Sequence, residues 1–280
     1  DLSLSAMSRA GSLTGSSQWL GTFLVMGLPL VLLGLFAETT RMRRVAYFAM
    51  STGGLGAVLL VHTRATWVAI GIELCVLGLL FLKPSWRNRT LIIMGSLVCL
   101  FLFFGIANLP IVTDSQVANP ATLHIRLNTW WFAIERMVEQ PVRGFTGIGY
   151  GKHSFNVAYP NLGPGFHTHI HNMFLALTVQ LGLPGLVLFG WIFWTVLRRS
   201  YKGFLDLSHL YIGRLSLAIL LGTIGLIVRN LFDDMFIGSV VYVYWLLIGL
   251  FCVALQANSE GKDVIIAPST EGRASSTQSA

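Results

Sequence analysis

Charge is scarce in this sequence, and that scarcity excludes most soluble folds. Asp, Glu, Lys and Arg make up 11% of the 280 residues, against about 25% in a typical soluble domain. So few charges cannot cover a surface that faces water. Hydrophobic residues reach 54%, and the mean hydropathy is +0.68. The composition excludes a soluble, a disordered and a collagen-like protein, and it indicates an integral membrane protein.

Cysteine is also rare. The three cysteines, Cys75, Cys99 and Cys252, lie within apolar runs, where a thiol packs as a small hydrophobic group. They therefore indicate neither a disulfide framework nor a metal site. A basic segment leading into a short apolar stretch is absent too, and the chain opens on Asp1 rather than Met. We expect no signal peptide and a missing amino-terminal part.

Long apolar runs, by contrast, are abundant. A helix needs about 20 residues to cross the hydrocarbon core of a bilayer, and in lipid its backbone groups must bond to one another. Seven stretches qualify, so the sequence predicts an all-α membrane protein with about seven transmembrane helices. They are Trp19 to Ala37, Val45 to Val61, Ala65 to Leu82, Leu91 to Leu109, Asn172 to Leu197, Leu210 to Val228 and Met235 to Gln256.

Lysine and arginine are sorted between the connections. Those after the first, third and fifth spans hold three each, and those after the second and sixth hold one each, Arg64 and Arg229. Because Lys and Arg are retained on the cytoplasmic side, the amino terminus is predicted to lie outside. The net charge of +7 thus reports topology rather than nucleic-acid binding. The nine cytoplasmic residues are Arg41, Arg43, Arg44, Lys83, Arg87, Arg89, Arg198, Arg199 and Lys202.

Residues 1–256 are predicted to form one polytopic membrane domain, with one long extracytoplasmic loop at about 110–171. Within this loop, Ile125 to Glu139 has apolar side chains at helical spacing, which predicts an interfacial amphipathic helix ended by Pro141. The glycines that follow, Gly147 and Gly149 among them, favour a tight turn with exposed amides, which could form a nest for an oxyanion. Residues 257–280 are rich in Ser, Thr, Gly and Ala, and are predicted to be a disordered cytoplasmic tail.

Cations gather on the outer side of this topology. An excess of positive charge beside lipid suits a substrate with a lipid tail and a phosphate or pyrophosphate head. Taken singly, Arg64 also fits an interfacial anchor, and Asp233 and Asp234 fit the caps of the last span. The outer group comprises Arg64, Arg126, Arg143, Lys152, His171 and Arg229.

Three histidines, His167, His169 and His171, alternate in the loop before the fifth span, a spacing that a metal site could use. Outer carboxylates are few and no zinc motif is present, so we expect no metal and no other cofactor. His171 lies at a helix amino terminus, which tends to lower the pKa of an imidazole and keep it neutral, able to act as a base. The alternative is an interfacial histidine bonded to a backbone carbonyl. Glu73, in mid-span, fits a buried structural hydrogen bond or a proton relay.

Four stretches in order resemble the O-antigen ligase and polymerase superfamily of bacterial envelope glycosyltransferases. Thr63-Arg64-Ala65 opens a span; Arg126, with Trp130 four residues on, leads to Pro141 and Gly147-Ile148-Gly149. His171-Asn172 precedes Gly182-Leu183 and Gly185-Leu186. Asn230-Leu231-Phe232-Asp233 precedes a last span with Trp245 and Gly249. The segment Arg9 to Gly21 also resembles the outer loop before a span in this superfamily.

The resemblance implies a multi-pass protein of the bacterial inner membrane with a metal-independent, inverting active site on the periplasmic side. The donor would be a glycan on undecaprenyl pyrophosphate, and the acceptor would be lipid A-core, another glycan or a protein. Arg64 and Arg126 would contact the pyrophosphate, and His171 would activate the acceptor hydroxyl or support the leaving group. Asn172, Gly147 and Gly149 would bind substrate with them, and charge placement adds Arg143 and Arg229 as substrate-binding candidates.

Other functions stay open at this stage. A polymerase of the same superfamily would extend a glycan on the same carrier. A small-solute transporter would rely on a midplane charge, and Glu73 is the one such residue in the predicted spans. A structural membrane subunit would not require the outer arginines.

Overall fold

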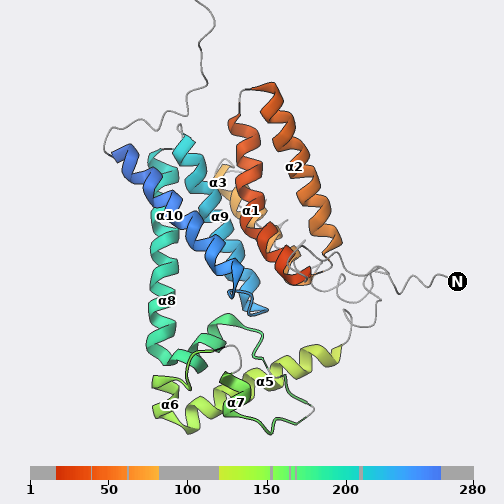
Figure 1. Ribbon diagram of the computed structural model, residues 1–280, viewed down its shortest axis with the longest axis vertical. Helices are drawn as coiled ribbons and strands as arrows, with labels where there is room; N and C mark the ends of the chain where they lie inside the picture. The colour runs from red at the N-terminus through yellow and green to blue at the C-terminus, as the bar shows by residue number, and fades with distance from the viewer. Residues whose placement is uncertain are drawn as a thin grey trace, which may run out of the picture.

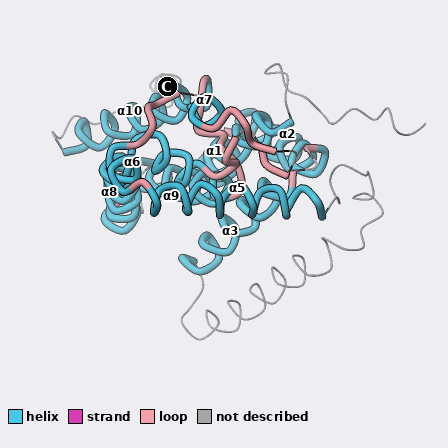
Figure 2. The backbone as a smooth tube through the Cα atoms, turned by 90° about the horizontal axis from the view of Figure 1, so that it is seen from below, coloured by secondary structure: helices cyan, strands magenta, loops and turns pink. Residues whose placement is uncertain are grey.

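The computed structural model describes residues 17–38, 40–61, 63–81, 120–151, 154–163, 165–167, 169–207 and 211–259. Within these ranges the chain is helical and forms no strand (Figure 2). Five of the helices in the described ranges are long and apolar enough to cross a membrane. They are α1 (Ser17–Ala37), α3 (Arg64–Phe81), α8 (Met173–Asp206), α9 (Tyr211–Leu231) and α10 (Ser239–Ser259).

The sequence predicted seven spans. Helix α2 (Arg41–Leu60) occupies the second, but it begins earlier than expected and includes Arg41, Arg43 and Arg44, so it is less apolar than the five. The predicted span Leu91 to Leu109 lies outside the described residues. Helix α10 begins at Ser239 rather than Met235 and continues to Ser259, so residues 257–259 of the expected tail are helical; the rest of the tail lies outside the described ranges.

Helix α9 is the centre of the bundle. Of its membrane-length segment 61% is buried, against 17–33% for the other four. It packs against α8, α1 and α3, and small residues such as Gly222 and Gly225 let these neighbours approach closely. A continuous apolar core of Met26, Leu177, Phe193, Leu226 and Tyr244 joins α1, α8, α9 and α10.

Helix α8 is not the straight span that the sequence predicted. Gly182 has φ +72° and interrupts it, so a first segment, residues 173–181, meets the long spanning segment at a bend (Figure 1). A Cβ at Gly182 would lie 1.8 Å from the carbonyl oxygen of Phe145, so only glycine fits. Pro184 follows the bend, and the spanning segment then continues through Arg198, Arg199 and Lys202, which were expected in a connection.

Arginine residues lie at both ends of the bundle. At one end Arg64 begins α3 and Arg229 lies in the last turn of α9, and the loops gather there over the helix ends (Figures 1 and 2). At the other end Arg43 lies 3.8 Å from Glu38 and Arg44 donates to the Glu38 carbonyl. The two groups of arginines that the sequence predicted on different sides of the membrane therefore lie at opposite ends of the helix bundle.

The segment between α3 and α8 contains α5 (Pro120–Glu139), α6 (Pro141–Thr146) and α7 (Ser154–Ala158). Helix α5 lies across the end of the bundle at which α3 begins and α9 ends, which is called the site end below (Figure 1). It begins before Ile125 but ends at Glu139 as predicted, because Pro141 starts α6. Trp130 packs inward, whereas the other predicted apolar positions are exposed: Leu127, Trp131, Ile134 and Val138.

Candidate functional site

His171 and Asp233 form a hydrogen-bonded pair at the site end. His171 precedes α8 and Asp233 lies between α9 and α10, yet Nδ1 of the imidazole is 2.9 Å from Oδ1 of the carboxylate. The backbone holds the two loops together as well, because the Met173 amide donates to the Asp233 carbonyl. His171 adopts φ +51°, a conformation uncommon in residues other than glycine, although asparagine, aspartate and histidine adopt it more often than the rest. A strained backbone position at a paired histidine is typical of a functional site.

The carboxylate of Asp233 fixes the tautomer of His171. Burial would raise the pKa of Asp233, but the hydrogen bond from His171 and the charges of Arg229, His171 and Arg126 outweigh burial and hold its pKa below the usual value. Asp233 is therefore ionised at neutral pH and can only accept hydrogen bonds. Nδ1 of His171 must then carry the proton, which leaves the lone pair of the neutral ring on Nε2.

Arg229 lies behind this pair. It is fully buried, with Nη1 3.7 Å from Oδ2 of Asp233 and Nη2 donating to the Gln18 carbonyl of α1 at 3.3 Å. The sequence predicted that Arg229 binds substrate directly. The contacts that the structure shows for this buried side chain are to Asp233 and to α1, so Arg229 supports the carboxylate that pairs with His171, and its binding of substrate stays a prediction.

Helix α5 is hydrogen-bonded to both the loop that carries His171 and the loop that carries Asp233. Arg126 donates from Nη1 to the Phe232 carbonyl at 2.7 Å, and Trp130, one turn on, donates to the Ile170 carbonyl at 2.5 Å. The four-residue spacing of Arg126 and Trp130 places both side chains on one face of the helix. This face therefore holds, by hydrogen bonds, the residues immediately before His171 and Asp233.

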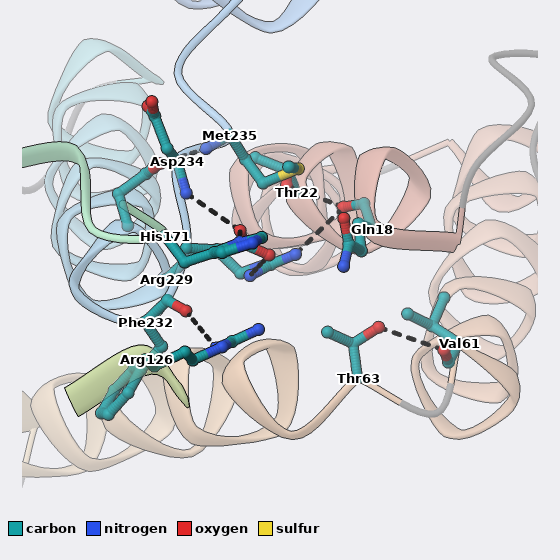
Figure 3. Close-up of polar contacts among 12 residues, drawn as sticks. Gln18, Thr22, Val61, Thr63, Arg126, His171, Arg229, Phe232, Asp234 and Met235 are labelled. Carbon is teal, nitrogen blue, oxygen red and sulfur yellow. Dashed lines mark hydrogen bonds and ion pairs between the residues drawn. The ribbon is translucent and has the colours of Figure 1, made fainter. Parts of the chain in front are cut away.

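Arg126 keeps donors for a ligand. Its Nε is buried and has no hydrogen-bond partner among the described residues. Arg64 lies near enough for its charge to be repelled by that of Arg126, and in Figure 3 the tip of Arg126 points toward Thr63, the neighbour of Arg64. Two arginines whose charges repel each other favour an anion such as phosphate.

The other two histidines surround His171. The ring of His167 lies 4.8 Å from that of His171, and the ring of His169 lies 6.4 Å from it. Burial, followed by the charges of His171, Arg126 and His169, lowers the pKa of His167, so its ring is neutral at neutral pH. Across the described ranges, no three His, Cys, Asp or Glu side chains are grouped to hold a metal ion.

A cavity of about 720 Å³ opens beside the pair, within the size range of small-molecule sites. The polar side chains that line it include His171, Asp233 and Asp234, together with Gln18 of α1 and Gln180 of α8. The rest is largely apolar and aromatic. These residues include Trp19, Tyr150, Met173, Leu177, Phe189, Phe236, Val241, Tyr242 and Trp245.

Asn172, which the sequence assigned to substrate, uses its side chain to hold two helix ends. Its Oδ1 accepts from the Leu175 amide at 3.0 Å and caps α8, while its Nδ2 donates to the Leu231 carbonyl at 3.1 Å. Both ends of the side-chain amide are therefore engaged. Asn172 holds His171 against the end of α9.

Gly147 and Gly149 are not the predicted oxyanion nest. The Gly147 amide donates to the Arg143 carbonyl, and the Gly149 amide donates to the Gln180 carbonyl at the end of the first segment of α8. A Cβ at Gly147 would lie 2.2 Å from the same Gln180 oxygen. These glycines pack α6 against the α8 bend, and their amides are occupied.

Three further residues lie apart from the pair or outside the described ranges. Arg143 is exposed on α6 and does not line the cavity. Lys152 lies outside the described residues. Glu73 is 4% exposed in α3 and faces Gly225 of α9, and its Oε1 has no partner among the described residues. The predicted structural hydrogen bond of Glu73 is therefore not formed through Oε1.

Asp233 and Asp234 were misjudged from the sequence, which assigned both to capping the last span. That span begins at Ser239, so neither lies in its first turn. Asp233 pairs with His171 and Arg229, and Asp234 lines the cavity. The signal available was the spacing of Arg229 and Asp233, which are four residues apart.

The sequence was compared with known proteins. A comparison with curated proteins finds none that matches the chain. The family model described as O-antigen ligase matches residues 48–190, just over half of the 280 residues. This match includes Arg64, Arg126 and His171, and it ends before Arg229 and Asp233. The chain therefore belongs to the O-antigen ligase family, within the ligase and polymerase superfamily that its motifs resemble.

Proposed function

We propose that the protein transfers a glycan from undecaprenyl pyrophosphate to an acceptor hydroxyl at the periplasmic face of the bacterial inner membrane. Membership of the family implies a ligase- or polymerase-type glycosyltransferase that acts on lipid-linked glycans in a membrane. The observation that carries the finer proposal is the His171–Asp233 pair, which borders the cavity and lies near Arg126. A base and a cation pair are the two elements that such a displacement needs.

The proposed reaction is a single displacement. The acceptor oxygen attacks the anomeric carbon of the donor sugar, a new carbon–oxygen bond forms, and the bond from that carbon to the phosphate oxygen breaks. Nε2 of His171 takes the proton of the acceptor hydroxyl, and Asp233 stabilises the imidazolium. Undecaprenyl pyrophosphate leaves with the bonding electron pair, and the configuration at the anomeric carbon is inverted.

Arg64 and Arg126 would neutralise the charge that develops on the leaving pyrophosphate. Guanidinium groups bind phosphate oxygens through paired hydrogen bonds, and the unpartnered Nε of Arg126 is a donor already freed from water. Pyrophosphate so held is a competent leaving group, so the reaction needs positioning and one base rather than a metal. We expect transfer to continue undiminished in a chelator such as EDTA.

The test is an assay with purified full-length protein, an undecaprenyl-pyrophosphate-linked glycan and candidate acceptors, in which new glycosidic product is measured. His171→Asn suits the φ of +51° better than an alanine does and removes the base. We expect His171→Asn and Arg64→Ala each to lower transfer by about 10² to 10⁴-fold while the protein stays in the membrane.

The matched control is Arg43→Ala, which removes an arginine from the opposite end of the bundle and should leave transfer within about twofold. Near-normal transfer in both His171→Asn and Arg64→Ala would overturn the proposal. The same assay separates ligase from polymerase, because only a polymerase accepts a second lipid-linked glycan as the acceptor.

A further inference from the structure

The cavity beside His171 differs in charge from the arginine side of the site. Among the described residues that line it, none is Arg or Lys, whereas Asp233 and Asp234 both are present. Arg64 and Arg126 do not line it. In Figure 3, Asp234 and Arg126 lie on opposite sides of His171. The histidine thus separates a cationic side from a side with carboxylates.

A pyrophosphate would not be stable within this cavity. Its negative charges would meet the carboxylate of Asp234 in a partly buried setting, where like charges repel more strongly than in water. The carboxylate of Asp233 is already paired with His171 and Arg229 and offers a phosphate no compensating cation among the described residues that line the cavity. Asp234 is ionised at neutral pH, because burial and the neighbouring Asp233 raise its pKa only to about 6 against a small opposing effect of His171. The charge distribution therefore points away from the donor head group as the occupant.

An uncharged sugar fits the same lining. Trp19, Tyr150 and Trp245 offer flat apolar faces to pyranose rings, and Gln180 and Asp234 offer polar groups for hydroxyls. A carboxylate bonded to a neutral hydroxyl forms a charge-assisted hydrogen bond, which is stronger than a bond between neutral partners. His171 lines the same cavity and would meet a hydroxyl of that sugar.

We propose that this cavity is the acceptor site and that it selects an uncharged, hydroxyl-rich sugar, with Asp234 accepting hydrogen bonds from that sugar while the donor pyrophosphate stays at Arg64 and Arg126. The proposal rests on the proposed function in naming this sugar the acceptor. It predicts that acceptors phosphorylated next to the reacting hydroxyl are used poorly.

A binding test needs no catalysis. Val241 lines the cavity from α10, and Val241→Cys, in a background with Cys75, Cys99 and Cys252 changed to Ala, can be labelled with a maleimide in lipid nanodiscs. The probes are octyl maltoside, kept below its micelle concentration, and geranyl pyrophosphate, so that each carries a short apolar chain and only the head differs.

We expect octyl maltoside to slow the labelling at least about threefold and geranyl pyrophosphate to leave the rate unchanged. Asp234→Asn, added to the same background, should weaken the protection by about 10- to 100-fold in apparent affinity, the effect of a lost hydrogen bond to a charged group. Asp206→Asn, the same change at the exposed far end of α8, is the matched control and should have no effect.

Protection by geranyl pyrophosphate alone, or by neither probe, would overturn the inference, as would protection unaffected by Asp234→Asn in a protein that stays folded in the nanodisc. These results do not depend on glycosyl transfer. A wild-type protein that shows protection but no transfer with any donor would contradict the proposed function and leave the neutral-sugar site standing.

Discussion

The Asp233→Asn substitution removes one charge and preserves the shape of the side chain. Oδ1 of Asp233 accepts from His171 and from the Asp234 amide at 3.0 Å, while Oδ2 faces Arg229. An asparagine has only one acceptor oxygen. If that oxygen stays toward His171, its NH₂ group faces a guanidinium; if it turns, the NH₂ group faces Nδ1 and forces the imidazole proton onto Nε2.

In either arrangement His171 loses the lone pair on Nε2 or the carboxylate that stabilises its protonated form. Loss of a positioned general base lowers turnover by about 10² to 10⁴-fold. Arg229 would also lose its carboxylate, and breaking a buried ion pair destabilises a protein by about 3–5 kcal/mol. We expect a value at the lower end, because the pair is 3.7 Å apart and Arg229 keeps its bond to Gln18.

The assay measures kcat with both substrates saturating, alongside the melting temperature of the purified protein. Asp206→Asn is again the control. If Asp233→Asn keeps more than about a third of wild-type kcat and the same dependence of rate on pH, then the carboxylate does not orient His171 and the mechanism is wrong.

Three further predictions concern stability and the midplane charge. Gly182→Ala should lower the melting temperature strongly because its Cβ meets backbone, whereas Gly190→Ala, which meets open space, should not. Asp234 has a folded pKa of about 6 against 3.8 unfolded, so its contribution to stability is complete below pH 3.8 and is lost as pH rises through 6. Asp234→Asn should therefore raise the melting temperature relative to wild type at pH 8 and not at pH 4, a result that equal shifts at both pH values would contradict. Glu73→Gln should keep transfer within about threefold, because Glu73 lies away from the cavity; loss of transfer together with a solute flux would favour a transporter.

Sequence reasoning located the spanning helices best, because bilayer thickness imposes a length that apolar runs reveal directly. Five of the predicted seven spans are found as long apolar helices. The bend in α8 was missed, since hydropathy does not report backbone conformation. Gly182 and Pro184 lie in a continuous apolar run, and only the approach of Phe145 explains why the helix breaks there.

The candidate site could be predicted in its residue types but not in its pairings. His171 and Arg64 stand out as polar groups at the ends of apolar segments, and Arg126 stands out as a cation on the amphipathic helix of the long loop. The partner of His171 lies 62 positions away, and no periodicity links residues so far apart. Asn172, Gly147 and Gly149 were assigned to substrate because they lie in the motifs that resemble the superfamily, whereas the folded chain uses their polar groups for its own helix ends and turns.

The measurement that tests the account most directly is the anomeric configuration of the linkage formed by the purified protein, determined by NMR and compared with that of the donor. One base, His171, and a pyrophosphate held by Arg64 and Arg126 require direct attack by the acceptor, so the account predicts inversion. Retention of configuration would require a covalent glycosyl-enzyme intermediate or attack from the face of the leaving group, and either route would contradict the role given to His171.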